Sequence, residues 1–258
     1  MVNSMDKKRN ILLIVEGAKT EVKLFERIIE CFPEINLSPD NIIVYDTSLW
    51  VLHGRLIKEF GQKWYMSNDI DFRKYIESQY PKIKGKKITD TFLIFDYERH
   101  DPLFDGEALR NFSIFFNDSV ENGQLYINYP MIESYKHLNI SPLPDNSYKD
   151  RICPVPDSQK YKEIVGAESK YTDVKKLDRN ILQQITIHNI KKISYILNSK
   201  YELSDKEVLD FCNTINYTKL VDKQNVCSCN LDGFIYVLCT CVLFISNYNK
   251  ALLYGRSE

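Results

Sequence analysis

The sequence lacks a long apolar run. Its longest, FIYVLCTCVLFI at residues 234–245, has 12 residues, whereas a helix that crosses a bilayer needs about 20. We therefore expect a buried core helix over residues 231–250 and no membrane span. The amino terminus, MVNSMDKKRN, also lacks an apolar leader followed by a small-residue cleavage site, which predicts a cytoplasmic protein.

An excess of charge of either sign is also absent. The formal net charge is −1 and the pI is about 6.5, so no global basic field attracts nucleic acid, and any basic surface must be a local patch. The seven cysteines are an odd number, which favours reduced thiols over a disulfide framework. Two pairs, Cys227 with Cys229 and Cys239 with Cys241, have a C-x-C spacing, and we expect free thiols rather than a zinc site.

Four short apolar segments organise the first part of the chain, and each is followed by a helical pattern. The segments are Ile11–Val15, Ile42–Tyr45, Thr91–Phe95 and Leu125–Ile127, and the helical patterns cover about 20–32, 49–60, 69–79, 105–119 and 132–138. Continuous apolar runs are typical of strands that are covered on both faces. We therefore predict an α/β domain at residues 1–140, with a mainly parallel four-stranded sheet and crossover helices.

The rest of the chain, residues 141–258, has a different pattern. Residues 141–157, SPLPDNSYKDRICPVPD, contain four of the nine prolines, and helical patterns follow at 158–168, 176–199, 204–213 and 231–250. This predicts a Pro-rich connection and a helical carboxy-terminal region. Residues 159–200 are rich in lysine, as in a surface that binds a nucleic-acid backbone or in a solvated helix face. The apolar last helix offers a surface for a second copy in a homo-oligomer.

Carboxylates stand where the predicted strands end. Glu16 follows the first strand, Asp96 and Glu98 end the third, and Glu133 follows the fourth. In a parallel sheet these ends share one edge, and converging carboxylates repel one another unless a cation lies among them or they take up protons. Hard oxygen ligands suit Mg²⁺ or Mn²⁺. If the third strand stays extended through residue 98, Asp96 and Glu98 point to one side, and Asp101 joins them from the next turn.

These residues resemble the TOPRIM domain, a Rossmann-like fold found in topoisomerases, primases and OLD-family nucleases. The resemblance rests on Glu16-Gly17 after a buried strand and on the acidic Asp96-Tyr97-Glu98 at the end of a later one. Thr20-Glu21 and the segment YINYPMIESYKH at residues 126–137 look closer still to RloB-like TOPRIM proteins of bacterial defence loci. The resemblance covers about 130 residues, those of the α/β domain.

The resemblance implies a Mg²⁺-dependent nuclease that cleaves DNA or RNA, including transfer RNA, as an anti-phage effector. The metal ligands carried over are Glu16, Asp96 and Glu98, and since the family has Asp-x-Asp, either Glu98 or Asp101 is the second ligand of the pair. Glu133 is a further catalytic position, and Lys19 and Arg99 would offset phosphate charge. No GxxxxGK followed by Ser or Thr occurs, so an ABC-type or OLD-like ATPase partner would be a separate protein.

Other interpretations stay open at this point. Glu16 alone is equally typical of a turn carboxylate, and Asp96 alone of a helix cap. A non-catalytic TOPRIM-like module that docks an ATPase partner is the main alternative function. A phosphoryl-transfer site of the receiver or haloacid-dehalogenase kind ranks last, because its nucleophilic Asp normally follows the first strand, where this chain has Glu16.

Overall fold

A mainly parallel sheet of five strands organises the first half of the chain. The computed structural model describes residues 9–67, 69–138, 146–169 and 173–255. The strands are β1 (Ile11–Val15), β2 (Ile42–Val44), β3 (Asp90–Asp96), β4 (Asn117–Asp118) and β5 (Gly123–Asn128), in the order β2-β1-β3-β5-β4. All neighbouring pairs are parallel except β4 and β5. The α/β prediction is confirmed, but the expected four strands are five, because residues 117–118 pair with β5 instead of extending a helix.

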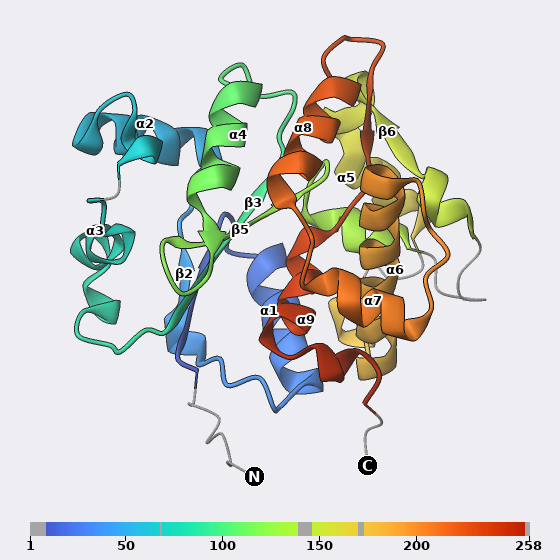
Figure 1. Cartoon of the computed structure of the whole chain (residues 1–258), viewed down its shortest axis with the longest axis horizontal. Coiled ribbons are helices and arrows are strands. Elements are labelled where there is room, and N and C mark those ends of the chain that lie inside the picture. The colour runs from blue at the N-terminus through green and yellow to red at the C-terminus, as the bar shows by residue number, and fades with distance from the viewer. Residues whose placement is uncertain (1–8, 68, 139–145, 170–172, 256–258) are drawn as a thin grey trace.

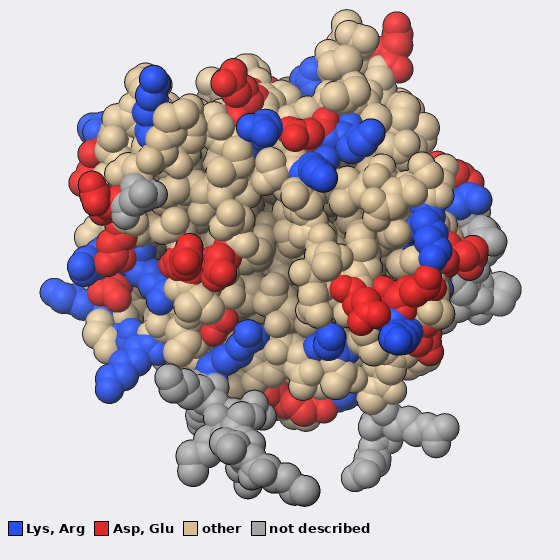
Figure 2. Space-filling view, in the orientation of Figure 1, with Lys and Arg blue, Asp and Glu red and all other residues tan. Residues whose placement is uncertain are grey.

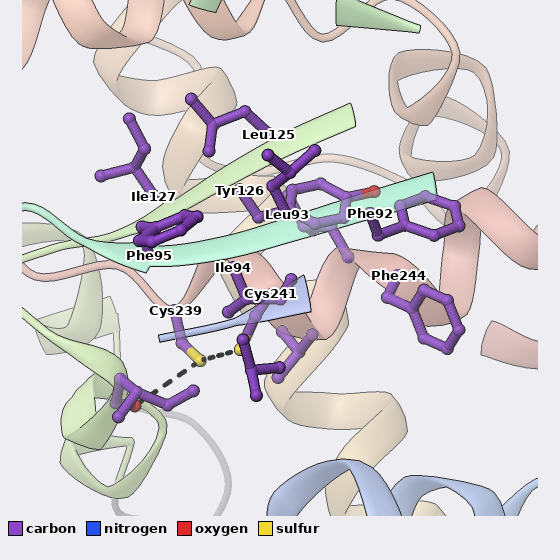
Figure 3. Packing of buried hydrophobic residues seen from close by; sticks show 14 of the residues in the cluster. Phe92, Leu93, Ile94, Phe95, Leu125, Tyr126, Ile127, Cys239, Cys241 and Phe244 are labelled. Atoms are coloured by element: carbon purple, nitrogen blue, oxygen red, sulfur yellow. Dashed lines mark hydrogen bonds between the residues drawn. The ribbon is translucent and has the colours of Figure 1, made fainter. Parts of the chain in front are cut away.

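Helices cover both faces of this sheet. They are α1 (Thr20–Cys31), α2 (Leu49–Phe60), α3 (Phe72–Gln79) and α4 (Gly106–Phe115). On the side of the sheet where α1 lies (Figure 1), Phe25 of α1 and Phe92 of β3 each pack edge-on against Phe244, with ring centroids 5.5 and 5.0 Å from it. Figure 3 shows Phe92 and Phe244. Elsewhere Trp64 packs on Phe112 of α4 at 4.9 Å. These buried contacts explain why the strands read as continuous apolar runs.

The strand register brings the carboxyl ends of the parallel strands to one edge. Val15 lies beside Ile94 of β3 and beside Val44 of β2, and Asp96 lies beside Asn128 of β5. The residues that follow β1, β2, β3 and β5 therefore meet at the same edge, as predicted.

The second half of the chain is helical, with a small sheet that the sequence did not predict. Its helices are α5 (Tyr161–Glu168), α6 (Arg179–Asn198), α7 (Asp205–Cys212), α8 (Tyr217–Cys227) and α9 (Phe244–Tyr248), and its sheet pairs β6 (Ile152–Pro154) with β7 (Phe234–Tyr236). Short 3-10 helices are η1 (Pro39–Asn41), η2 (Trp64–Met66), η3 (Pro81–Ile83), η4 (Ile132–His137), η5 (Asn146–Asp150), η6 (Val155–Lys160), η7 (Val174–Lys176), η8 (Thr240–Leu243) and η9 (Lys250–Leu253).

The apolar segment at residues 234–245 is buried, but it is not the single helix we expected. It runs through β7, a bridge between Leu238 and Tyr129, η8 and the start of α9. The Thr240 hydroxyl donates to the carbonyl of Ile127 at 2.7 Å, and Cys239 and Cys241 lie side by side beneath the sheet (Figure 3). Because the segment is covered on every side, its apolar run had no period to distinguish strand from helix.

The two halves share one apolar cluster, which extends from Ile11 to Leu253. The boundary predicted at residue 140 lies outside the described residues, and the division into two domains stays a prediction. Among the described residues, no helix combines the length and the apolarity that crossing a membrane would require. On the face shown in Figure 2 the acidic and basic side chains are interspersed.

Candidate functional site: a carboxylate cluster at the sheet edge

Glu16 extends β1 by one residue and is held by backbone bonds on both sides. Its N–H donates to the carbonyl of Ile94 at 3.1 Å, and its carbonyl accepts from the N–H of Asp46 at 2.9 Å. Its carboxylate accepts from the backbone N–H of Asp96 at 3.0 Å. Burial and then the charge of Glu98 raise the pKa of Glu16 to about 8, although the Asp96 N–H favours the ionised form. Glu16 is therefore a fixed carboxylate whose charge is poorly compensated.

Asp96 is the last residue of β3 and lies beside Glu16. Its side chain accepts from the Asn128 amide at 3.4 Å, and the same amide accepts from the backbone N–H of Cys241 at 3.2 Å. Burial raises the pKa of Asp96 well above its usual range, and the charges of Glu16 and of other carboxylates nearby raise it further. Asn128 is fully buried, and sequence patterns did not single it out.

Glu21 is a member of the cluster that the sequence did not identify as a site residue. It lies in the first turn of α1, is only 7% exposed, and accepts from the N–H of Gly17 at 3.2 Å. A Cβ at Gly17 would lie 3.0 Å from a Glu21 carboxylate oxygen, so the glycine makes room for it. Burial and the charge of Glu133 raise the pKa of Glu21. The available signal was the glycine directly after Glu16, which allows a carboxylate to fold back onto the turn.

Glu98 reaches the cluster through a turn, and the predicted extended strand is wrong at this point. β3 ends at Asp96, and Glu98 has φ 39°, in the left-handed region that non-glycine residues seldom adopt. Tyr97 points away from the cluster, as expected, and its hydroxyl bonds to Ser228 at 2.7 Å. Burial and the charge of Asp101 raise the pKa of Glu98.

Asp101 follows in the turn that Glu98 opens. Its N–H donates to the Glu98 carbonyl at 2.9 Å, and its carboxylate accepts from the N–H of Leu103 at 2.7 Å. By contrast, the carboxylate of Glu98 accepts no hydrogen bond from the described residues. Of the two alternatives for the second acidic ligand, Glu98 is the one whose oxygens are uncommitted.

Glu133 joins the cluster from η4 and is the best compensated carboxylate in it. It is 3% exposed, accepts from the Thr20 hydroxyl at 3.2 Å, and forms an ion pair with Lys162 of α5 at 3.0 Å. Lys162 was not predicted as a site residue, because it lies 29 residues further along the chain. Its contact shows that the second half of the chain contributes to this edge.

The two predicted cationic residues lie differently. Lys19 is exposed at the start of α1 and lines a surface cavity of about 190 Å³. Arg99 donates from Nε to the carbonyl of Ser228 at 3.0 Å, and its guanidinium lies over the ring of Phe104 at 4.6 Å. Arg99 is thus bound to the end of α8, whereas Lys19 is available to a ligand.

The donor chemistry of the cluster fits a hard divalent cation, because the side chains offer carboxylate oxygens. The positions of these side chains do not yet form a metal site. Within the ranges that the structure describes, no group of three or more His, Cys, Asp or Glu side chains is arranged to hold a metal ion. One oxygen of Glu16 is occupied by the Asp96 N–H, and Glu133 by Lys162. Coordination of a metal ion by three of these side chains would require them to move from the positions described.

Comparisons with protein-family models, with curated proteins and with solved structures find no match to this chain.

Proposed function

We propose that the chain is a Mg²⁺- or Mn²⁺-dependent nuclease of the TOPRIM type that hydrolyses phosphodiester bonds in DNA or RNA. One observation carries the proposal: Glu16, Glu21, Asp96 and Glu98 crowd one sheet edge, and the pKa of each is raised. Crowded carboxylates at a partly buried edge either take up protons or bind a cation, and groups with raised pKa values cluster at functional sites. The Glu16-Gly17 and Asp96-Tyr97-Glu98 motifs support the same proposal.

Glu16, Asp96 and Glu98 are the residues that would hold the metal, with Asp101 and Glu133 beside them. A bound divalent ion would lower the pKa of a coordinated water and offset charge on the phosphate. The Asp96 N–H and the Asn128 amide fix the directions of Glu16 and Asp96. Lys19, which lines the cavity beside Thr20, would compensate phosphate charge. An effector role in bacterial defence with a separate ATPase belongs to the same proposal.

A matched pair of aspartates on β3 tests the proposal. Asp96 ends the strand inside the cluster, while Asp90 begins it at the opposite edge, where Ser119 donates to it at 3.0 Å. Plasmid DNA and total transfer RNA are incubated with Mg²⁺, Mn²⁺ or EDTA. We expect Asp96→Asn to lower metal-dependent cleavage by about 100-fold or more, and folded Asp90→Asn to retain it. Equal activity of Asp96→Asn and wild type would refute the proposal.

The alternative function is a non-catalytic module that docks an ATPase partner. The observation in its favour is the Lys162–Glu133 ion pair, which compensates one carboxylate without a metal. The alternative predicts that the wild type cleaves neither substrate with any metal, and that Asp96→Asn leaves capture of an ABC-type ATPase unchanged.

A further inference from the structure

A lysine-lined cavity lies directly beside the carboxylate cluster. It has a volume of about 190 Å³, and its lining includes Lys19, Lys23 and Lys136, with Tyr135 and Asp173. Lys19 and Lys23 are four residues apart at the start of α1, so they project from the same side of the helix. Lys136 comes from η4 and lines the same cavity. Three cations and one carboxylate thus face a common space.

The three lysines have no anionic partner in the described part of the chain. None of them takes part in an ion pair there, although nearby lysines such as Lys162 do. The carboxylate of Asp173 is engaged elsewhere, since it accepts from the N–H of Lys175 at 3.0 Å. Burial lowers the pKa of Lys136, which is half-buried over the ring of Tyr135. Among the described residues, three lysines and one carboxylate line the cavity, so it carries an excess of positive charge.

The cavity and the carboxylate cluster share a wall. Thr20 lines the cavity, and its hydroxyl donates to Glu133 at 3.2 Å. Glu133 and Lys136 are three residues apart on a 3-10 helix, where such residues lie on one side. The charge of Glu133 opposes the effect of burial and raises the pKa of Lys136. A ligand that spans both features must carry negative charge in the cavity and reach the carboxylates through a cation.

We propose that this cavity is a subsite for a phosphate of the nucleic-acid backbone, next to the phosphate held at the carboxylate cluster. The inference rests on the proposed function. It supplies the local basic patch that a chain with a net charge of −1 needs in order to bind nucleic acid. A backbone has phosphates at regular spacing, so one chain places one phosphate at the cluster and its neighbour among the lysines. DNA and RNA share this chemistry. The contact positions the strand and carries no base specificity.

The test measures binding separately from cleavage. Short fluorescent DNA and RNA oligonucleotides are titrated in Ca²⁺ in place of Mg²⁺, so that a cation can bridge the backbone to the carboxylates, and gel analysis verifies that the oligonucleotides stay uncleaved. The variant is Lys23→Gln with Lys136→Gln, which leaves Lys19 and the carboxylates intact. The control is Lys84→Gln with Lys87→Gln, two exposed lysines before β3 at the opposite sheet edge. Thermal unfolding verifies that both double variants are folded.

We expect the Lys23/Lys136 variant to bind about tenfold more weakly. Its plot of log affinity against log salt should be shallower by about 0.7–0.9 per lost phosphate contact. The control should bind as the wild type does. Loss with either oligonucleotide supports the proposal and tells which substrate uses the subsite. Unchanged binding, an equal loss in the control, or a wild type that binds neither oligonucleotide overturns it. Lysine-dependent binding without cleavage in Mg²⁺ would refute the nuclease and leave the subsite standing.

Discussion

Two regions of this molecule bury ionisable side chains, and they differ in how many hydrogen-bond partners those side chains have. Lys192 of α6 is fully buried, and its amine nitrogen donates to the carbonyls of Tyr148 at 2.8 Å and Arg151 at 2.5 Å, over the ring of Tyr148 at 4.4 Å. Glu16 and Asp96 are crowded by like charges and have few donors. Burial lowers the pKa of Lys192 well below its usual range, but its amine has two carbonyl acceptors. A buried polar group that has hydrogen-bond partners stabilises the fold, whereas a cluster of like charges with few donors indicates a ligand.

The largest effect we expect from this comparison is on Lys192. Lys192→Met keeps the length of the side chain but removes its two hydrogen bonds to the carbonyls of Tyr148 and Arg151, each of which keeps only one backbone N–H donor. It should destabilise the fold by about 3 kcal/mol. The measurement is the free energy of unfolding from denaturant titration. Lys191→Met, which changes a more exposed neighbour, should change it by less than about 0.5 kcal/mol. Similar effects of both substitutions would contradict the structural role of Lys192.

Glu16→Gln should have the opposite effect and raise the free energy of unfolding. The pKa of Glu16 is about 8 in the fold against an ordinary value of 4.5, so the folded state binds more protons between these values and the wild type loses stability as the pH rises through them. The amide keeps an acceptor for the Asp96 N–H without the charge. One pKa unit corresponds to about 1.4 kcal/mol, and because neighbouring groups relax part of the repulsion we expect a gain of about 2 kcal/mol at high pH.

Denaturant unfolding in EDTA, at pH 8 and again near pH 4.5, measures this gain for Glu16→Gln. The gain should be present at the higher pH and nearly absent at the lower one, where the wild-type carboxyl is protonated in the folded state and about half protonated in the unfolded chain. Added Mg²⁺ should reverse the order at high pH, because only the wild type offers the carboxylate to the metal. A variant that is less stable than the wild type at high pH in EDTA would show that the Glu16 charge is already compensated.

The sequence predicted the parallel core of this fold well and the second half less well. Continuous apolar runs and the helical patterns after them located β1, β2, β3 and β5, because each element there carries its own pattern. Helix α8 was missed since its inner face carries Gln224, which is fully buried and bonds both the N–H and the carbonyl of Tyr236 at 3.0 and 2.9 Å. A buried glutamine in place of an apolar residue interrupts the helical apolar pattern of α8. Its hydrogen bonds to β7 cannot be recognised from the sequence of either segment.

The candidate site could likewise be predicted only in part from the sequence. The order of strand ends placed Glu16 and Asp96 at one edge, because parallel topology alone decides that. Glu21, Asn128 and Lys162 were missed, since their roles depend on side-chain contacts between segments that are distant in sequence or folded back on a turn. Local patterns do not encode such contacts, and only the folded chain assembles them.

The smallest effect we expect concerns Lys162, which links the two kinds of buried charge. It is an exposed lysine that compensates the buried Glu133, and Lys162→Met should destabilise the metal-free protein by about 1 kcal/mol or less, as for other exposed ion pairs. Lys160→Met, an exposed neighbour with no ion pair in the described residues, serves as the control. If the cluster binds a cation, Mg²⁺ takes over the compensation of Glu133, so the deficit of Lys162→Met should shrink when Mg²⁺ is added. A deficit that stays the same in Mg²⁺ and in EDTA would mean that the ion pair and a bound metal never compete, and that Glu133 belongs with Lys192 among the buried groups that stabilise the fold.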